Sequence, residues 1–136
     1  MMKYLLDTNI CIFLMKNSFP PMTDRMLRLD PDDFAVSSVT LFELEYGAAK
    51  SKWGERTRDA LYAFLSPFAV LPFDSDDAIA AGKIRALLEA QGNPIGPYDL
   101  QIAAQAYTRQ LSVITHNTDE FSRVPGLRAE DWVILS

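Results

Sequence analysis

Short apolar runs alternate along the chain with longer segments in which apolar residues recur at helical spacing. Short runs bounded by turn residues predict buried strands, and the helical periodicity predicts amphipathic helices. The predicted strands cover residues 3–7, 34–39, 69–73, 111–115 and 132–135. The predicted helices cover residues 10–16, 23–29, 40–52, 55–65 and 75–91, and a further helix begins after Pro97.

Local signals place several boundaries. The stretch SFPPM, residues 18–22, is expected to end the first helix, and Ser38 or Thr40 is expected to cap the third. Residues 116–128 are expected to form a loop with one helical turn. Alternating strands and helices predict an α/β protein whose mainly parallel sheet of about five strands has helices on both faces. We therefore expect one three-layer α/β/α domain over residues 1–136.

Acidic residues follow several of the predicted strands. Asp7 ends the first strand, Glu43 lies in the helix after the second, Asp99 opens the helix after Pro97, and THNTDEF follows the strand at 111–115. Ligands of such sheets bind outside the carboxyl ends of the strands, so these acids are expected at one edge. Hard divalent cations need several oxygen ligands in a compact cluster. The arrangement predicts a Mg²⁺ or Mn²⁺ site for cutting phosphodiesters.

Each acid also has a purely structural interpretation. Asp7 can cap the helix that follows it, and Asp99 can complement the positive end of its own helix. Glu43 can be a solvated residue on an amphipathic helix. Four unrelated surface acids are not expected to share one sheet edge, and this favours the metal site.

The charge balance argues against a general nucleic-acid binder. The chain of 136 residues carries a net charge of -5 and has a pI near 4.7, whereas such binders usually present a basic face. The objection weakens if the acids share a pocket, because bound cations would offset their charge. Lys50, Lys52, Arg56 and Arg58 alternate with acids and are expected to be solvated rather than to contact RNA.

Single residues exclude other classes of protein. Cys11 is the only cysteine, so it cannot form an internal disulfide and is expected to pack in a helix. His116 is the only histidine, which excludes a histidine-pair mechanism and favours a turn or substrate-contact role. The chain opens with MMKYLL rather than a basic and apolar leader, and no apolar run approaches the roughly 20 residues that span a bilayer. We expect a cytoplasmic protein without a membrane segment.

Four segments together resemble the PIN-domain ribonucleases, and among them the VapC-type toxins of bacterial toxin-antitoxin pairs. The segments are LDTNICIFL, VTLFELEYGAAKS, PIGPYDLQIAAQA and SVITHNTDEFSRVPGL, in the family's order. The resemblance implies a PIN-like fold and a Mg²⁺- or Mn²⁺-dependent endoribonuclease that leaves 5′-phosphate and 3′-hydroxyl ends. The implied substrate is tRNA, with the anticodon stem-loop of initiator tRNA as the expected target.

The resemblance also implies partners. A VapB-like antitoxin would lay its tail in the active-site groove and place a basic residue among the carboxylates. Such toxins commonly form homodimers and larger assemblies with the antitoxin. Those assemblies often bind their own promoter, so DNA binding would be indirect, through the antitoxin.

Residues two apart on a helix point to nearly opposite sides, so only one of Glu43 and Glu45 can face the site. Spacing alone does not show which one. The resemblance places Glu43 in the site and Glu45 on the solvated surface. It makes Asp7 and Asp99 the metal ligands, with Glu43 and Glu120 completing the catalytic acids.

The fourth acid has competing candidates. Many PIN domains carry Asp where Asn117 stands, and the resemblance then places Glu120 in the site with Asn117 as a neutral ligand or hydrogen-bonding group. Asp119 is the competing acid. The expected supporting or substrate-contact residues are Thr8, Asn9, Tyr98, Thr115, Asn117 and Asp119.

The aromatic residues are expected to divide between core and surface. Phe42 and Tyr98 are next to predicted site acids and could stack on bases, although core packing is the stronger expectation for Phe42. Trp53 is expected to be exposed, and Trp132 is expected to close the C-terminal strand against the sheet.

Two other functions fit parts of the pattern. A phosphorelay receiver is also a five-strand α/β domain with an acidic pocket, but it usually has adjacent acids after the first strand and a Lys after the late strand. This chain has Leu6-Asp7 and Thr115-His116 at those places. The second alternative is a PIN-like module that binds RNA or protein without cutting.

Overall fold

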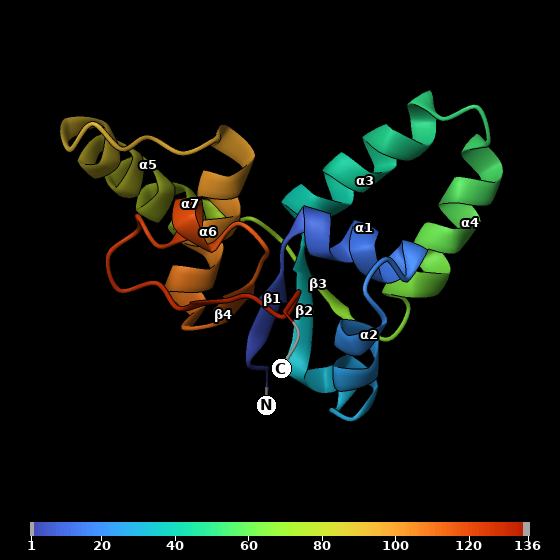
Figure 1. Ribbon diagram of the computed structural model, residues 1–136. Coiled ribbons are helices and arrows are strands. Elements are labelled where there is room, and N and C mark those ends of the chain that lie inside the picture. The colour runs from blue at the N-terminus through green and yellow to red at the C-terminus, as the bar shows by residue number, and fades with distance from the viewer. Residues whose placement is uncertain (1, 135–136) are drawn as a thin grey trace.

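A single five-stranded parallel sheet forms the centre of the computed structural model, which describes residues 2–134 (Figure 1). The order across the sheet is β3-β2-β1-β4-β5, and every neighbouring pair is parallel. In the register, Tyr4 of β1 lies opposite both Phe34 of β2 and Ser112 of β4. The strands are β1 Tyr4–Leu6, β2 Phe34–Ser37, β3 Ala69–Leu71, β4 Ser112–Ile114 and β5 Ala129–Glu130.

Helices connect the strands and cover both faces of the sheet, so the predicted three-layer α/β/α class is confirmed. Figure 1 shows α5, α6 and α7 on one side, and α1, α2 and α4 on the other. The hairpin of α3 and α4 projects away from the sheet. The helices are α1 Thr8–Lys16, α2 Pro20–Leu27, the short 3-10 helix Pro31–Asp33, α3 Ser38–Lys50, α4 Gly54–Leu65, α5 Ser75–Ala90, α6 Pro97–Arg109 and α7 Thr118–Phe121.

Alternating side chains of the strands supply two hydrophobic cores. Successive residues of a strand point to opposite faces, and both faces here are buried, which explains the nearly continuous apolar runs. The first core holds Leu5, Ala35 and Val113 together with the inner sides of α5 and α6. The second core holds Leu6, Val36, Ile114, Cys11 and residues of α1, α2 and α4. The expected packing role of Cys11 is thus confirmed, because its side chain is fully buried.

The starts of α2 and α3 differ from the prediction. The segment SFPPM was expected only to end the first helix, but Pro20 within it is also the first residue of α2. Proline suits this position because the N–H that it lacks is not needed there and its fixed φ matches the helix. The third helix begins at Ser38, and its cap is Ser37, whose hydroxyl accepts a hydrogen bond from the Val39 N–H at 3.0 Å.

The predicted last strand at 132–135 is wrong for the residues that the structure describes. Residues 129 and 130 pair with β4 instead, and Leu135 lies outside the described range. Trp132 nevertheless packs against the sheet as expected: its ring is 5.1 Å from that of Tyr4 and 5.9 Å from that of Phe34, between centroids. The apolar residues of this segment therefore mark a buried coil that covers the sheet, not a strand.

The strand order places a crevice between β1 and β4. The chain moves from β1 outward to β3 in one direction, and then crosses back to β4 and β5 on the other side of β1. Such a reversal leaves the carboxyl ends of the two strands open between diverging connections, which is where α/β sheets bind ligands. The order also differs from the 2-1-3-4-5 arrangement of receiver domains. The receiver alternative is therefore excluded by topology.

None of the helices between residues 2 and 134 is long and apolar enough to cross a membrane.

Candidate active site

Asp7 lies at the crevice because it is the residue between β1 and α1. Its side chain caps α1, with Oδ1 accepting a hydrogen bond from the Ile10 N–H at 2.8 Å, and only 3% of the residue is exposed. Burial raises the pKa of Asp7 to about 6, although hydrogen bonds from Thr115 and Ile10 oppose it, and the charge of Glu43 raises it further. The cap uses one carboxylate oxygen, so capping does not exclude the predicted role of Asp7 as a metal ligand.

Glu43 projects from α3 toward the start of α1. Its Oε1 lies 2.7 Å from the Thr8 hydroxyl, which is also 3.1 Å from the Thr40 hydroxyl. A hydroxyl has one proton, so Thr8 can donate to either Glu43 or Thr40, and the Glu43 oxygen is the closer of the two acceptors. The predicted supporting residue Thr8 therefore fixes a carboxylate. Thr40 was expected as a possible helix cap, but it is fully buried and holds Thr8.

Glu45 points away from this cluster. Its carboxylate accepts hydrogen bonds from Arg58 Nε at 3.1 Å and from the Tyr62 hydroxyl at 3.0 Å, both on α4. The structure therefore separates Glu43 from Glu45 as expected. Arg58 therefore forms a surface ion pair with Glu45.

Asp99 stands in the first turn of α6, whose first residue is Pro97. Burial raises the pKa of Asp99 to about 6, and the negative charges of Glu120, Asp7 and Glu43 add to the effect. The four predicted acids are thus close enough to act on one another, although they come from four separate segments of the chain.

Glu120 is held in place by two donors. Its Oε1 accepts a hydrogen bond from the Gly96 N–H at 2.7 Å, and its Oε2 accepts one from the Asn117 amide. A Cβ placed on Gly96 would lie 3.6 Å from Glu120 Oε1 and 3.9 Å from Asp99 Oδ2, so this backbone sits between the two acids. Sequence reasoning missed Gly96. The Gly-Pro pair just before Asp99 was a signal that the backbone is exposed there.

The neighbours of Glu120 occupy different positions. Asp119 is exposed, and it is not among the charges that raise the pKa of Asp7 or Asp99. Thr115 is fully buried, and its hydroxyl accepts a hydrogen bond from the Asn117 N–H at 2.9 Å. Asn9 is exposed in the first turn of α1. The structure therefore brings Glu120, not Asp119, into the acidic cluster.

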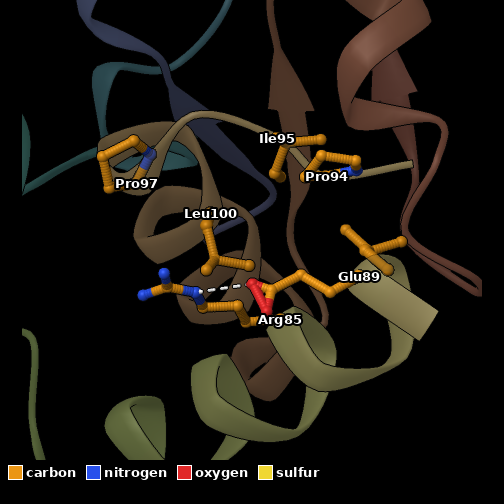
Figure 2. Close-up of a pocket in the computed structure, with 7 residues that line it drawn as sticks. Arg85, Glu89, Pro94, Ile95, Pro97 and Leu100 are labelled. Carbon is orange, nitrogen blue, oxygen red and sulfur yellow. Dashed lines mark hydrogen bonds and ion pairs between the residues drawn. The ribbon is translucent and has the colours of Figure 1, made fainter. Parts of the chain in front are cut away.

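The loop that leads from α5 into α6 is tied to the segment around α7. Besides the contact of Gly96 with Glu120, Arg123 donates a hydrogen bond to the Pro94 carbonyl at 2.8 Å. A small cavity of about 140 Å³ lies under this loop, and Figure 2 shows Pro94, Ile95 and Leu100 among the residues that line it. The ion pair of Arg85 and Glu89 closes its side. None of the four acids lines this cavity, so it supports the loop and is separate from the acidic cleft.

His116 borders the cleft without joining the acids. Its Nδ1 is 3.0 Å from Asp131 Oδ2, and its ring lies 6.2 Å from that of Phe13, between centroids. The side chain is exposed. This fits the expected place in a turn beside the site.

The chemistry of the cluster suits a hard cation. All four side chains offer carboxylate oxygens, and burial together with the neighbouring negative charges raises the pKa values of Asp7 and Asp99. Within residues 2–134, no three Asp, Glu, His or Cys side chains converge tightly enough to enclose an ion as they stand. Asp7, Glu43 and Glu120 all accept hydrogen bonds from neutral donors. The predicted assignment of Asp7 and Asp99 as metal ligands is compatible with this arrangement.

Comparison with known proteins agrees with this geometry. Residues 4–127 match the family model of the PIN domain. The tRNA(fMet)-specific endonuclease VapC of Shigella flexneri is 48% identical over 132 residues, which cover 97% of this chain and 99% of that protein. Ribonuclease VapC2 of Haemophilus influenzae is 40% identical and covers 98% of this chain and 100% of that protein.

Solved structures show the same fold. A chain in the crystal structure of DNA-bound VapBC from Salmonella typhimurium has a TM-score of 0.92 and 46% identity, covering 97% of this chain and 99% of that one. A chain of VapBC2 from Rickettsia felis, bound to a DNA fragment from the promoter, has a TM-score of 0.90 and 35% identity and covers 96% and 99%. The chain therefore belongs to the PIN-domain family and, within it, to the VapC proteins.

Proposed function

We propose that this protein is a metal-dependent endoribonuclease of one PIN domain, the toxin of a type II toxin-antitoxin pair. Its substrate class is tRNA, and its expected target is the anticodon stem-loop of initiator tRNA, because the relatives from Shigella flexneri and Salmonella typhimurium are named tRNA(fMet)-specific endonucleases. The observation that carries the proposal is the cluster of four carboxylates at the crevice between β1 and β4. Cleavage of tRNA would arrest translation and growth, and the expected compartment is the cytoplasm.

Asp7 and Asp99 are the residues that would hold Mg²⁺ or Mn²⁺. When bound, such a cation supplies positive charge that stabilises the negative charge growing on the phosphoryl group. The cap of α1 fixes the direction of Asp7, and the first turn of α6 fixes that of Asp99. Both carboxylates sit on rigid helix starts, which suits a site that must hold its geometry.

Glu43 and Glu120 complete the site from opposite sides. Thr8 and Thr40 form a chain of hydroxyls that orients Glu43, while Gly96 and Asn117 orient Glu120. These neutral donors hold each glutamate in one orientation at the site. Asn117 thus acts as a positioning residue for Glu120 in this proposal.

A cleavage assay tests the activity. Antitoxin-free protein is incubated with a total tRNA pool in Mg²⁺ or Mn²⁺, and the fragments are separated and sequenced. We expect discrete fragments with 5′-phosphate and 3′-hydroxyl ends, and no fragments in EDTA, because the carboxylates alone leave the negative charge of the phosphate unbalanced. Folded protein that cuts neither tRNA nor other cellular RNA with either metal would instead support the alternative of a binding module without catalysis.

A VapB-like antitoxin is the proposed protein partner. The structures of relatives from Salmonella typhimurium, Rickettsia felis and Haemophilus influenzae are VapBC complexes, and the first two contain DNA. We propose that this chain likewise forms a hetero-oligomer with the antitoxin, dimerises, and reaches promoter DNA only through that partner. A basic residue of the antitoxin tail would pair with the carboxylates.

Co-expression tests the partner. Expression of this chain alone is expected to arrest growth, and co-expression of the antitoxin encoded beside it is expected to restore growth and to co-purify with the chain. A neighbouring protein that neither binds the chain nor relieves the arrest would contradict this assignment.

A further inference from the structure

Two aromatic rings meet beside the acidic cluster of Asp7, Glu43, Asp99 and Glu120. Phe42 comes from α3 and Tyr98 from α6, two helices that contact each other across the crevice. Their ring centroids are 5.6 Å apart, with an angle of 57° between the planes. This spacing is that of a tilted aromatic pair in contact. The pair therefore forms one continuous apolar surface that joins two elements of the site.

The pair is exposed, which overturns the expectation that Phe42 packs in the core. Phe42 is 54% exposed and Tyr98 is 43% exposed. On α3, Leu44 is buried in the second hydrophobic core. Phe42 is therefore not needed to fill that core. Half-exposed rings in contact with each other leave their outer faces free to take up a flat ligand.

Each ring is adjacent in sequence to an acid of the site. Phe42 precedes Glu43 and Tyr98 precedes Asp99. Neighbouring residues of a helix are rotated by about 100°, so while Glu43 turns toward Thr8 on α1, Phe42 turns toward α6. The rings therefore lie beside the carboxylate cluster and not inside it.

The surface beyond the pair is matched to a nucleic acid. Tyr46, one turn after Phe42, is 60% exposed, and the Lys50 ammonium lies 4.8 Å from the centroid of its ring. Aromatic rings that alternate with cations suit single-stranded RNA, since bases stack on the rings and phosphates contact the cations. The positive charge of Lys50 lies outside the acidic cluster, on the surface over which an RNA strand would extend away from the four acids.

We propose that Phe42 and Tyr98 form a stacking platform for one unpaired base of the RNA substrate, next to the phosphodiester in the acidic cleft. The inference rests on the proposed function and adds how the substrate is positioned. A base held out of its own stack is fixed by the ring faces, and its neighbouring phosphate is thereby aligned with the carboxylates. The platform does not select a base by hydrogen bonding, so it selects for an unpaired loop.

Leucine variants test the platform, because leucine keeps an apolar side chain and removes the π face. The Phe42→Leu, Tyr98→Leu double variant is expected to lose about 5- to 150-fold in kcat/KM for an anticodon stem-loop RNA, the range of one base-aromatic stack. Phe42→Trp is expected to retain activity. The matched control is Tyr107→Leu, an equally exposed tyrosine (49%) at the far end of α6, which is expected to leave kcat/KM unchanged.

A binding measurement separates this inference from the proposed function. Metal-free protein is mixed with stem-loop RNA that carries 2-aminopurine at successive loop positions. We expect quenching at one loop position with the wild type and with Tyr107→Leu, and recovery of the fluorescence with the double variant. Wild-type protein that cleaves while the double variant cleaves and quenches equally well would overturn the platform alone. Wild-type protein that does not bind the RNA would overturn both.

The oligomeric state tests whether Phe42 and Tyr98 instead cover an interface between copies of the chain. If the double variant changes the solution mass measured by light scattering, and its activity returns at high protein concentration, the rings cover an interface between copies of the chain and the platform is wrong. An unchanged mass with reduced cleavage and lost quenching supports it.

Discussion

Asp99→Asn lowers kcat for RNA cleavage by more than about 100-fold at saturating Mg²⁺. The substitution removes one of the two carboxylates that the proposal assigns to the metal. Loss of an outer partner of a metal site typically costs about 10- to 100-fold in activity or affinity, so loss of a direct ligand should exceed that range. The same variant is expected to lose the ability to arrest growth when expressed alone. Single-turnover cleavage of stem-loop RNA measures the effect on the chemical step.

Glu45→Gln is the matched control for Asp99→Asn. It removes an acid two residues from Glu43 that faces Arg58 and Tyr62 instead of the cleft. Its cleavage rate should equal that of the wild type, because a surface pair of this kind contributes little even to stability. Activity in Asp99→Asn within a few fold of the wild type, with the same melting temperature as Glu45→Gln, would remove Asp99 from the site.

Metal-free wild-type protein loses stability relative to Asp99→Asn as the pH rises from about 4 to about 7. The folded state raises the pKa of Asp99 from 3.8 to about 6. Between these values the folded chain keeps a proton that the unfolded chain has released, so this carboxyl contributes stability below pH 3.8 that is lost as the pH passes 6. Asp7 behaves in the same direction, because its pKa is also raised to about 6. Urea unfolding of both proteins over this pH range gives the difference in the free energy of unfolding.

The comparison between the two proteins is needed because other carboxyls act in the opposite direction. Burial raises the pKa of Asp77, but hydrogen bonds from Thr108 and Asp74 and the charge of Arg109 outweigh it and lower the pKa. That carboxyl is common to both proteins and cancels in the difference. A difference that stays constant or grows in favour of the wild type over this range would contradict the repulsion within the cluster.

Divalent cations should offset the loss of stability that the wild-type protein shows at higher pH. At pH 7.5, Mg²⁺ or Mn²⁺ at about 100 times its dissociation constant would stabilise the wild type by about 2.7 kcal/mol, which for a chain of this size raises Tm by about 10 °C. Asp99→Asn should show a much smaller rise. Equal rises in both proteins would show that the ions bind elsewhere.

The sequence pattern was sufficient for four of the five strands and for the acidic edge of the sheet. The apolar runs at β1, β2 and β4 are short and largely buried, and the run at the edge strand β3 is short and bounded by turn residues, so all four stand out from the helical periodicity around them. Once the strands are parallel, acids that follow different strands must share an edge. The position of Asp7 at this edge could therefore be predicted from strand order. Asp99 follows a helix instead of a strand, and it reaches the same edge because its helix α6 leads back into the parallel strand β4.

Other features depend on tertiary contacts that periodicity does not encode. The apolar positions of α3 do not show which of its sides meets the rest of the protein, and Phe42 was therefore expected in the core although it is exposed. The four residues of α7 are too few to show a periodicity, so only the family resemblance favoured Glu120 over Asp119, and the contact of Glu120 with the Gly96 N–H agrees with that choice. Backbone donors such as the Gly96 N–H have no side-chain signature.

The pairing of Tyr4 with Ser112 means that the sheet is completed only after most of the chain has been synthesised. The middle strand of the sheet is made first, but one of its two partners comes only after α6, and Glu120 later still. Contacts between such distant parts of a chain form late in folding, because a long loop must close before they contribute. While the ribosome is still making the chain, the acids on its early and late segments are apart. Under the proposed activity on tRNA, the ribosome therefore completes this chain before the catalytic site is assembled.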